Sequence, residues 1–573
     1  MKRLLPYLKH QKLRLLIQII VKIIGTLMDL AIPYVLTYII DEVVPVTTKE
    51  NYTQILWYGL LMVGFSIIGL SFNIIANQSA SYIARTVTRG LRHDLFSKVQ
   101  NLSNTQIDEL TMPSIISRLS SDTYNVHHMV GMMQRIGIRA PILLIGGIIV
   151  TLTLDVKLTL ILLIALPLIV LVTIIVSKLG IPLFNSVQSS IDNMIRVIRE
   201  NISGIRVIKA LSKMDYEKNR FNKVNKEVMN YELKSGYTMA TLSPIINVLL
   251  NVGLVAVLVV GAINIKGEET KVGTVMAFTT YFTIILNAML TITRIFMVFS
   301  RSLASLTRIS YILDMKEDLK VEDIEEKESE YFIEFNNVDF SYNKKELNLE
   351  KINFKLKHGQ TLGIIGATGS GKTTIINLLM RFYDIDNGEI LINGRNVKNI
   401  PPKELKDMFG IAFQNDTIFS DTIKENIMFG RNISEEDLQK AIKVSQAYEF
   451  ICNQKEGLET ILTPKGTNIS GGQKQRLYIA RALANNPEIL ILDDSSSALD
   501  YKTDSLLRKE IQSNYNTTTI IIAQRISSIK HSDYILVLDE GKTVGYGTHE
   551  QLMATSTIYN EIYQSQMGGG IDE

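Results

Sequence analysis

The chain has 573 residues, more than a single hydrophobic core accommodates, so at least two domains are expected. Its 60 basic and 57 acidic side chains leave a net charge of only +3, a balance that gives no indication of a nucleic-acid-binding protein. Cys452 is the only cysteine, which excludes an intrachain disulfide and a cysteine-based metal cluster.

Six long apolar runs occupy the N-terminal part of the chain. Each is long enough to cross a bilayer as a helix, which takes about 20 residues. The predicted spans are 14–40, 54–82, 128–153, 158–180, 238–265 and 273–298. Since an even number of spans returns the chain to its starting side, both termini are expected on the same side of the membrane.

Basic residues are concentrated at the ends of the first two spans. They precede the first span or follow the second, at Lys2, Arg3, Lys9, Lys12, Arg14, Arg85, Arg89, Arg92 and Lys98. Short loops rich in Lys and Arg stay in the cytoplasm, so the N-terminus is predicted to be cytoplasmic. The first residues are basic but lack an apolar region followed by a small-residue cleavage site, so they are not interpreted as a cleaved signal.

Residues 83–127 and 181–237 are helical in pattern but polar. They could form two separate cytoplasmic hairpins, or the membrane helices could continue into the cytoplasm and turn there. The second arrangement is favoured, because neither stretch has a cluster of Gly, Pro and Ser at the membrane edge that would end a helix.

Several predicted spans carry a polar face. In the first span it consists of Gln18, Lys22, Thr26 and Asp29, which share one side of a helix. The same spacing recurs in the fifth and sixth spans, at Ser243, Asn247, Asn251, Thr283, Asn287, Thr291 and Arg294. Charge is costly in hydrocarbon, so Lys22, Asp29 and Arg294 are predicted to line a cavity, whereas the Ser, Thr and Asn positions could equally join helices together.

The pattern changes after residue 315. Residues 316–330 are charged and lack apolar periodicity, which indicates a linker. Beyond it, apolar runs at 361–366, 488–494 and 517–525 alternate with helical segments, which is typical of a largely parallel sheet. The runs at 334–342 and around 386–394 indicate antiparallel strands with tight turns.

A glycine-rich loop gives the strongest indication of function. It follows an apolar strand and opens a helix, with the residues Gly366, Ala367, Thr368, Gly369, Ser370, Gly371, Lys372, Thr373 and Thr374. This context favours a phosphate-binding loop over a chance glycine cluster, because glycines let backbone N–H groups surround phosphates at a helix N-terminus. Lys372 is predicted to reach the β- and γ-phosphates of a nucleotide, and Thr373 to offer its hydroxyl to Mg²⁺.

Asp493 ends the buried strand that begins at Ile489. A phosphate-loop ATPase holds its Mg²⁺ with a carboxylate at the end of such a strand. The strand alone would be weak evidence, but it follows Lys372 by roughly 120 residues, as expected for that class of ATPase. Asp493 is therefore predicted to be a metal ligand.

A third motif lies between these two and opens a helix, with the residues Ser470, Gly471, Gly472 and Gln473. With these three motifs, residues 340–525 resemble the ATP-binding cassette family. The third motif matches the signature sequence of that family, with Ile469 in place of the usual Leu. The resemblance implies further roles: Gln414 reaches Mg²⁺ and senses the membrane domain, and 497–500, ending at Asp500, crosses a dimer interface. It also implies that Tyr342 stacks on adenine, although an ordinary strand aromatic is the alternative.

In that family two cassettes face each other head to tail, and each ATP lies between one chain's phosphate loop and the other chain's signature. The fused spans resemble the exporter type. The implied organisation is an all-α, six-helix transmembrane domain with long cytoplasmic extensions (1–315), the linker (316–330), an α/β cassette (331–566) and a tail (567–573). The cassette would carry an antiparallel β subdomain and a helical subdomain. A short coupling helix that contacts the partner's cassette is expected around Met214–Lys218.

Two positions depart from the family pattern. Asp494 stands where the family has a glutamate that positions the attacking water, and it is one methylene shorter. Gln524 stands where the family has a histidine beside the γ-phosphate, and glutamine cannot carry a proton's charge. A smaller departure is Pro464, where such exporters usually have glutamate. Together these changes resemble the degenerate half of a heterodimeric exporter.

The leading hypothesis is a subunit of an ATP-driven exporter that works by alternating access. It would bind ATP and Mg²⁺ at a weakly hydrolytic site and supply its complete signature to a partner half-transporter with Glu and His at the matching positions. A homodimer with slow hydrolysis is the second hypothesis, and a non-transporting ATP-gated regulator or channel subunit is the third. Six membrane spans exclude a soluble chromosome-type ATPase.

The substrate is predicted only as a class. Apolar walls with a few charges and amides suit an amphipathic drug, lipid or peptide. A peptide-processing exporter is not expected, because no peptidase-like domain precedes the first span. The chain is expected to be a multi-pass protein of the plasma membrane, the cytoplasmic membrane of a bacterium, with both termini in the cytoplasm.

Overall fold

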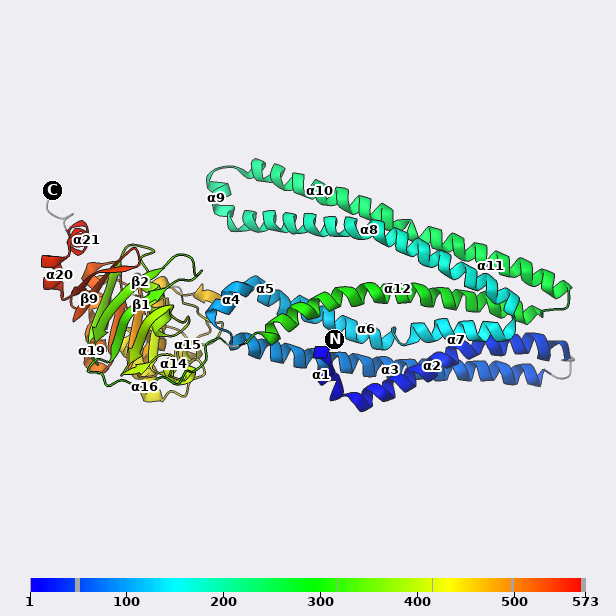
Figure 1. Ribbon diagram of the computed structural model, residues 1–573, viewed down its shortest axis with the longest axis horizontal. Helices are drawn as coiled ribbons and strands as arrows, with labels where there is room; N and C mark the ends of the chain where they lie inside the picture. The colour runs from blue at the N-terminus through cyan, green and yellow to red at the C-terminus, as the bar shows by residue number, and fades with distance from the viewer. Residues whose placement is uncertain (1, 47–51, 317, 415, 496–498, 568–573) are drawn as a thin grey trace. The chain divides into compact units, whose positions relative to one another are not determined.

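A computed structural model describes residues 2–46, 52–316, 318–414, 416–495 and 499–567. The chain divides into two compact units. The first, the membrane unit, contains Met1–Lys98 and Pro113–Met315; the second, the cassette unit, contains Val99–Met112 and Lys316–Glu573. Figure 1 shows the first as long helices and the second as a sheet covered by shorter helices.

The membrane unit is entirely helical, and its six longest apolar helical stretches are candidate membrane spans among the described residues. This confirms the six predicted spans. The helices of this unit are α1 (Leu5–Lys9), α2 (Lys12–Tyr38), α3 (Thr53–Gln100), α5 (Met112–Ser117), α6 (Thr123–Arg135), α7 (Arg139–Leu154), α8 (Val156–Ser203), α9 (Ile205–Ala210), α10 (Met214–Ala240), α11 (Leu242–Lys266) and α12 (Val272–Asp314).

Two of these helices are far longer than a membrane is thick. Both α3 and α8 contain 48 residues, which corresponds to about 72 Å of helix against a hydrocarbon core of about 30 Å. The prediction that membrane helices continue beyond the bilayer is therefore confirmed. Asp155 separates α7 from α8. Its backbone is extended, and its side chain caps α8 by accepting a hydrogen bond from the Leu158 backbone N–H.

Aromatic residues of α12 fill the core of the membrane unit. Phe278, Tyr281 and Phe282 are almost completely buried, and the Tyr281 hydroxyl donates to the Leu30 carbonyl oxygen of α2 at 2.6 Å. Lys22 differs from its prediction: it is 2% exposed and donates to the amide oxygens of Asn73 and Asn77 on α3. It joins two helices instead of lining a cavity, because those amides satisfy its charge within the bundle.

The turn between α8 and α10 also differs from its prediction. The short separate helix is α9, at Ile205–Ala210, and Met214–Lys218 form the first turns of the 27-residue helix α10. Ser212 lies between them with a φ of 51°, a left-handed conformation that ends the first helix before the second begins. The prediction of a short separate helix around Met214–Lys218 was therefore wrong, whereas the contact with a partner's cassette stays a prediction.

The cassette unit is built on one ten-stranded sheet in the order β5-β4-β1-β2-β10-β9-β3-β8-β7-β6. Its strands are β1 (Ile333–Phe340), β2 (Leu349–Leu356), β3 (Thr361–Gly366), β4 (Asn387–Ile392), β5 (Arg395–Asn396), β6 (Phe409–Ala412), β7 (Ile489–Asp493), β8 (Thr518–Ile522), β9 (Tyr534–Asp539) and β10 (Lys542–Gly547). Strands β9, β3, β8, β7 and β6 are parallel, and β1 pairs antiparallel with β2 and β4. Both predicted kinds of strand are confirmed.

Helices cover this sheet and form a lobe beside it. They are α4 (Asn104–Leu110), α13 (Lys372–Leu379), α14 (Pro402–Asp407), α15 (Ile423–Met428), α16 (Glu435–Val444), α17 (Tyr448–Cys452), α18 (Gly471–Leu483), α19 (Tyr501–Asn514), α20 (His549–Thr555) and α21 (Thr557–Met567). Buried residues of α15 to α18, the helices of the predicted helical subdomain, belong to one hydrophobic cluster that also includes residues of strands β7 and β8; among them are Ile423, Ile442 and Leu477.

Helix α4 belongs to the cassette unit although it is separated from it in sequence. The Tyr383 hydroxyl donates to Asp108 at 2.7 Å, and the Gln106 amide donates to the Lys316 carbonyl at 2.7 Å. Ser103 caps α4 in a capping box with Gln106, so the helix is locally well defined. The sequence assigned these residues to the membrane domain, because polar helical patterning does not reveal which unit a helix packs against.

Candidate functional site

The sequence motifs meet at one edge of the parallel sheet. Strands β3, β8 and β7 are neighbours and parallel, so their carboxyl ends lie side by side. Lys372 follows β3, Asp493 ends β7, and Gln524 lies two residues beyond β8. The fold thus brings together residues that are more than a hundred positions apart, at the edge where ligands bind in open α/β sheets.

The glycine-rich loop between β3 and α13 requires its glycines. Gly369 and Gly371 have φ values of 86° and 97°, a region that other residues rarely adopt. A Cβ atom on Gly366 would lie 2.1 Å from the carbonyl oxygen of Leu538 on the adjacent strand β9. The glycines therefore permit the tight, partly left-handed path that a phosphate cradle needs.

Two polar groups of the loop fit an anionic ligand. The Ser370 hydroxyl is buried and has no hydrogen-bond partner among the residues that the structure describes. The Lys372 ammonium donates to the carbonyl oxygens of Gly366 and Ala367, at 2.9 and 2.8 Å, so it lies folded over the loop. Burial lowers the pKa of Lys372, while attraction by Asp493 and Asp494 opposes this shift. A bound polyphosphate would supply acceptors to the cation and the hydroxyl.

Asp493 and Thr373 form the oxygen pair that the sequence assigns to Mg²⁺. Asp493 is 3% exposed, and its Oδ2 accepts a hydrogen bond from the Thr373 hydroxyl at 3.3 Å. Burial raises the pKa of this carboxyl, although the Thr373 hydrogen bond opposes the shift. One carboxylate and one hydroxyl beside a phosphate cradle suit Mg²⁺, which keeps several waters and binds few protein ligands.

Asp494 is held by two amides. Its Oδ2 accepts from Gln414 Nε2 at 3.0 Å and from Gln524 Nε2 at 3.3 Å. Its backbone is left-handed, with a φ of 47°, and burial raises the pKa of its carboxyl while the Gln414 hydrogen bond lowers it. The two positions that depart from the family pattern are thus in direct contact, together with the glutamine expected to reach Mg²⁺.

The sequence missed Gln566, which holds the backbone beside Gln524. Its amide donates to the Gln524 carbonyl oxygen at 2.7 Å and accepts from the Ile526 N–H at 2.8 Å. The last helix, α21, therefore anchors the segment after β8. A glutamine on a polar helix face gives no sequence signal, because such residues are usually solvated.

Tyr342 lies beside the phosphate loop helix with an exposed ring. The side chain is 43% exposed, and its hydroxyl lies 3.3 Å from both the Thr374 hydroxyl and the Asn377 amide. Tyr383 meets it edge-on, at 5.0 Å between ring centroids. A partly exposed, fixed ring is suited to stacking on a planar base.

The signature residues open α18 in the helical subdomain. Ser470 caps the helix by accepting from the Gln473 N–H at 3.3 Å, and the Gln473 side chain accepts from the Ser470 N–H at 2.8 Å. Asp500 caps α19 in a similar way by accepting from the Thr503 N–H at 2.9 Å, and these hydrogen bonds lower the pKa of its carboxyl. Ser497 and Ala498, in the predicted interface loop, lie outside the described residues.

Replacement of Gly366 by alanine should destabilise the cassette more than replacement of Gly369. At Gly366 the new methyl group overlaps a backbone carbonyl, which we expect to cost about 3 kcal/mol. At Gly369 no atom lies within 4 Å, so only left-handed strain of about 1 kcal/mol arises. Scanning calorimetry of the nucleotide-free full chain should therefore show a larger fall in cassette melting temperature for Gly366→Ala. Equal shifts would contradict this path of the loop.

Comparison with known families covers most of the chain. Residues 15–289 match the family described as the ABC transporter transmembrane region, and residues 349–497 match the family described as ABC transporter. The second match includes the phosphate loop, Gln414, the signature residues and Asp493.

Relatives and a solved structure match over nearly the full length. An ABC transporter ATP-binding protein of Bacillus subtilis, YfiB, is 34% identical over 99% of both chains. A Staphylococcus aureus protein, named as a multidrug export ATP-binding/permease protein, is 32% identical over 99% of both chains. The structure of a bacterial Atm1-family ABC exporter with ATP bound shares the fold, with a TM-score of 0.85, 23% identity, and coverage of 98% of this chain and 99% of that one.

Proposed function

The chain belongs to the ABC transporter family, as an exporter with fused transmembrane and cassette domains, and we propose that it is the degenerate-site subunit of a heterodimer. Such an exporter couples ATP hydrolysis to transport across a membrane. In the proposed assembly, this chain binds one ATP that is hydrolysed poorly. Its signature completes a competent site on a partner chain.

The contact between Asp494 and Gln524 carries this proposal. A water-positioning glutamate reaches further than Asp494 by one methylene, and misplacement by about 1 Å costs on the order of 100-fold in rate. The Asp494 oxygen is also engaged by Gln414 and Gln524. An amide at position 524 can donate to a γ-phosphate but cannot carry a proton's charge. The nucleotide is therefore held without efficient hydrolysis.

The residues that would hold the nucleotide are otherwise complete. The loop from Gly366 to Thr374 would surround the phosphates, with Lys372 between the β- and γ-phosphates, and Tyr342 would stack on adenine. Thr373, Asp493 and Gln414 would hold Mg²⁺, which neutralises charge that develops on the phosphates when it is bound. Residues Ser470 to Gln473 would close over the partner's ATP, and Asp500 would lie at the same interface.

Alternating access follows from this assignment. ATP at both sites draws the two cassettes together and opens the membrane bundle outward, and hydrolysis at the partner's competent site resets it. The substrate is proposed to be an amphipathic compound, and the multidrug-export name of the Staphylococcus aureus relative supports this class. Both termini are proposed to be cytoplasmic, with domains at 1–315 and 331–566 joined by the linker 316–330.

The isolated chain should hydrolyse ATP slowly. Its own site lacks the catalytic pair, so the purified chain in lipid nanodiscs should show a steady-state rate about 100-fold below that of the chain co-purified with its partner. A phosphate-release assay at saturating ATP measures both rates. The control is the partner's glutamate-to-glutamine variant, which should lower the heterodimer to the rate of the isolated chain.

Two other functions remain distinguishable by experiment. Equal turnover by the isolated chain and by the heterodimer would favour a homodimer. ATP-dependent turnover without uptake of amphipathic dyes into inside-out vesicles would favour a regulator or channel subunit. Uptake that requires both chains supports the proposed exporter.

A further inference from the structure

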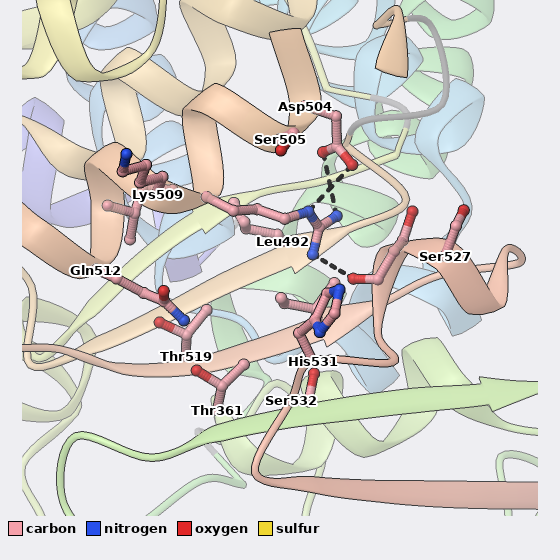
Figure 2. A pocket seen from close by; sticks show the side chains of 14 residues that line it. Thr361, Leu492, Asp504, Ser505, Lys509, Gln512, Thr519, Ser527, His531 and Ser532 are labelled. Atoms are coloured by element: carbon pink, nitrogen blue, oxygen red, sulfur yellow. Dashed lines mark hydrogen bonds and ion pairs between the residues drawn. The ribbon is translucent and has the colours of Figure 1, made fainter. Parts of the chain in front are cut away.

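A cavity of about 240 Å³ lies in the cassette unit behind helix α19 and apart from the nucleotide site. It is lined by residues of α19, of strands β3, β7 and β8, and of the segment 527–532, and it is partly open to solvent. Figure 2 shows Asp504 and Ser505 at one end of it and Thr361 and Ser532 at the other, with Lys509 and Gln512 along one side. None of these six residues belongs to the motifs assigned to ATP or Mg²⁺.

The charges around the cavity favour an anion. Arg508 donates from Nε and Nη2 to the two Asp504 oxygens, at 3.0 and 3.1 Å, and from Nη1 to the Ser528 carbonyl oxygen. These contacts fix the guanidinium plane, so its remaining N–H groups have a defined direction. Lys509 adds a second cationic side chain to the lining. Asp504 is the one carboxylate among the described lining residues and pairs with Arg508, so Lys509 leaves the lining with a net positive charge.

Other lining groups indicate an organic ligand rather than a bare ion. The hydroxyls of Ser505, Ser527 and Ser532 provide neutral hydrogen bonds, and Leu492, Ile511 and Ile521 provide apolar surface. A volume of about 240 Å³ lies just below the usual range for drug-sized ligands, so the occupant is small. A lining that contains both cationic side chains and apolar surface suits a molecule with an anionic group and a short apolar body.

We propose that this cavity binds a small organic monocarboxylate. Its carboxylate would accept charge-assisted hydrogen bonds from Arg508 and Lys509, and its apolar body would lie on Leu492 and Ile521. A neutral compound of the same shape would lose these hydrogen bonds, which are worth about 1.5–3 kcal/mol, or at least about tenfold in affinity. The site is independent of the degenerate-site assignment, because no residue of the hydrolytic pair lines it.

Photoaffinity labelling of the full chain in lipid nanodiscs tests the proposal. The probe is 4-azidobenzoate, and mass spectrometry identifies the labelled peptides. Saturable labelling is expected in the peptides of α19 or 527–532. The acid 4-hydroxybenzoate should suppress it at concentrations about tenfold lower than the neutral 4-hydroxybenzamide. Equal competition by the two compounds, or no saturable labelling of these peptides, would overturn the proposal.

Two matched pairs of variants locate the site on α19. Ser505 and Ser513 are both exposed on this helix, but only Ser505 lines the cavity. Ser505→Trp should block labelling, and Ser513→Trp should preserve it. Lys509→Gln should weaken labelling about tenfold, whereas Lys502→Gln on the same helix should not. Both lysine variants change exposed side chains, so they test the binding site even if the tryptophan variant folds poorly. Equal labelling of the two lysine variants would contradict the proposed position of the site.

Discussion

Gly471→Asp in this chain should nearly abolish ATPase activity of the proposed heterodimer, whereas Lys372→Ala should leave substantial turnover. Gly471 belongs to the signature, which would face the partner's competent site. An introduced carboxylate there repels the γ-phosphate and removes a preorganised contact, and such losses cost about 100- to 1000-fold in rate. In the proposed heterodimer Lys372 would serve the degenerate site, where ATP would mainly hold the cassettes together, so its loss should weaken binding at one site only.

The position of Gly471 allows an effect on activity to be separated from an effect on stability. It is an exposed residue in the first turn of α18, directly after the Ser470 cap. A negative side chain in the first turn of a helix interacts favourably with the helix dipole, so Gly471→Asp should not unfold the subdomain. The loss of activity would therefore report on the partner's site and not on stability. Lys372 has no such effect on the signature, because it follows β3 in a different part of the fold.

Steady-state ATPase of the two single variants, each assembled with an unmodified partner, measures the asymmetry. Calorimetry of each variant provides the stability control. A symmetric transporter predicts comparable loss from either change. If Lys372→Ala proved as severe as Gly471→Asp, the assignment of this chain to the degenerate half would have to be abandoned.

The sequence was most informative where local chemistry and fold agree. A strand, a glycine-rich turn and a helix N-terminus must be contiguous to make a phosphate cradle, so the arrangement of β3, loop and α13 was predictable, whereas phosphate binding by the loop stays a prediction. The parallel strands were predictable from apolar runs such as Ile489–Asp493, which are buried along their whole length. The six spans followed from length and composition alone.

Long-range side-chain contacts were not predictable in the same way. Gln566 reaches the backbone at Gln524 from 42 positions away, and Lys22 finds its partners on α3. Polar residues on helices look alike in sequence whether they face solvent, a cavity or another helix. The short helix was predicted too far along the chain because a left-handed residue at Ser212, which is not a glycine, separates α9 from α10.

Restoring the hydrolytic pair should raise ATP hydrolysis at this chain's own site by about 100-fold, the rate cost of misplacing a catalytic group by about 1 Å. The change is Asp494→Glu combined with Gln524→His. The longer side chain extends the carboxylate toward the γ-phosphate, and histidine can carry the proton's charge that glutamine cannot. The backbone beside position 524 is already held by Gln566, so the new imidazole would project from an anchored position.

The two substitutions are expected to work together rather than separately. In the present chain Gln414 and Gln524 both donate to the same Asp494 oxygen. A change at position 494 alone, or at position 524 alone, therefore leaves the unchanged residue in a position unsuited to activating a water. Single-turnover ATPase with the partner's catalytic glutamate changed to glutamine isolates this site. Each single substitution should raise the hydrolysis rate only slightly, and the double substitution should give the full increase. Lys372→Ala, added to the double substitution, should remove this increase because the phosphates are no longer held. A double repair without any gain would contradict the proposal that Asp494 and Gln524 alone silence the site, and it would mean that another departure, such as Pro464, also disables it.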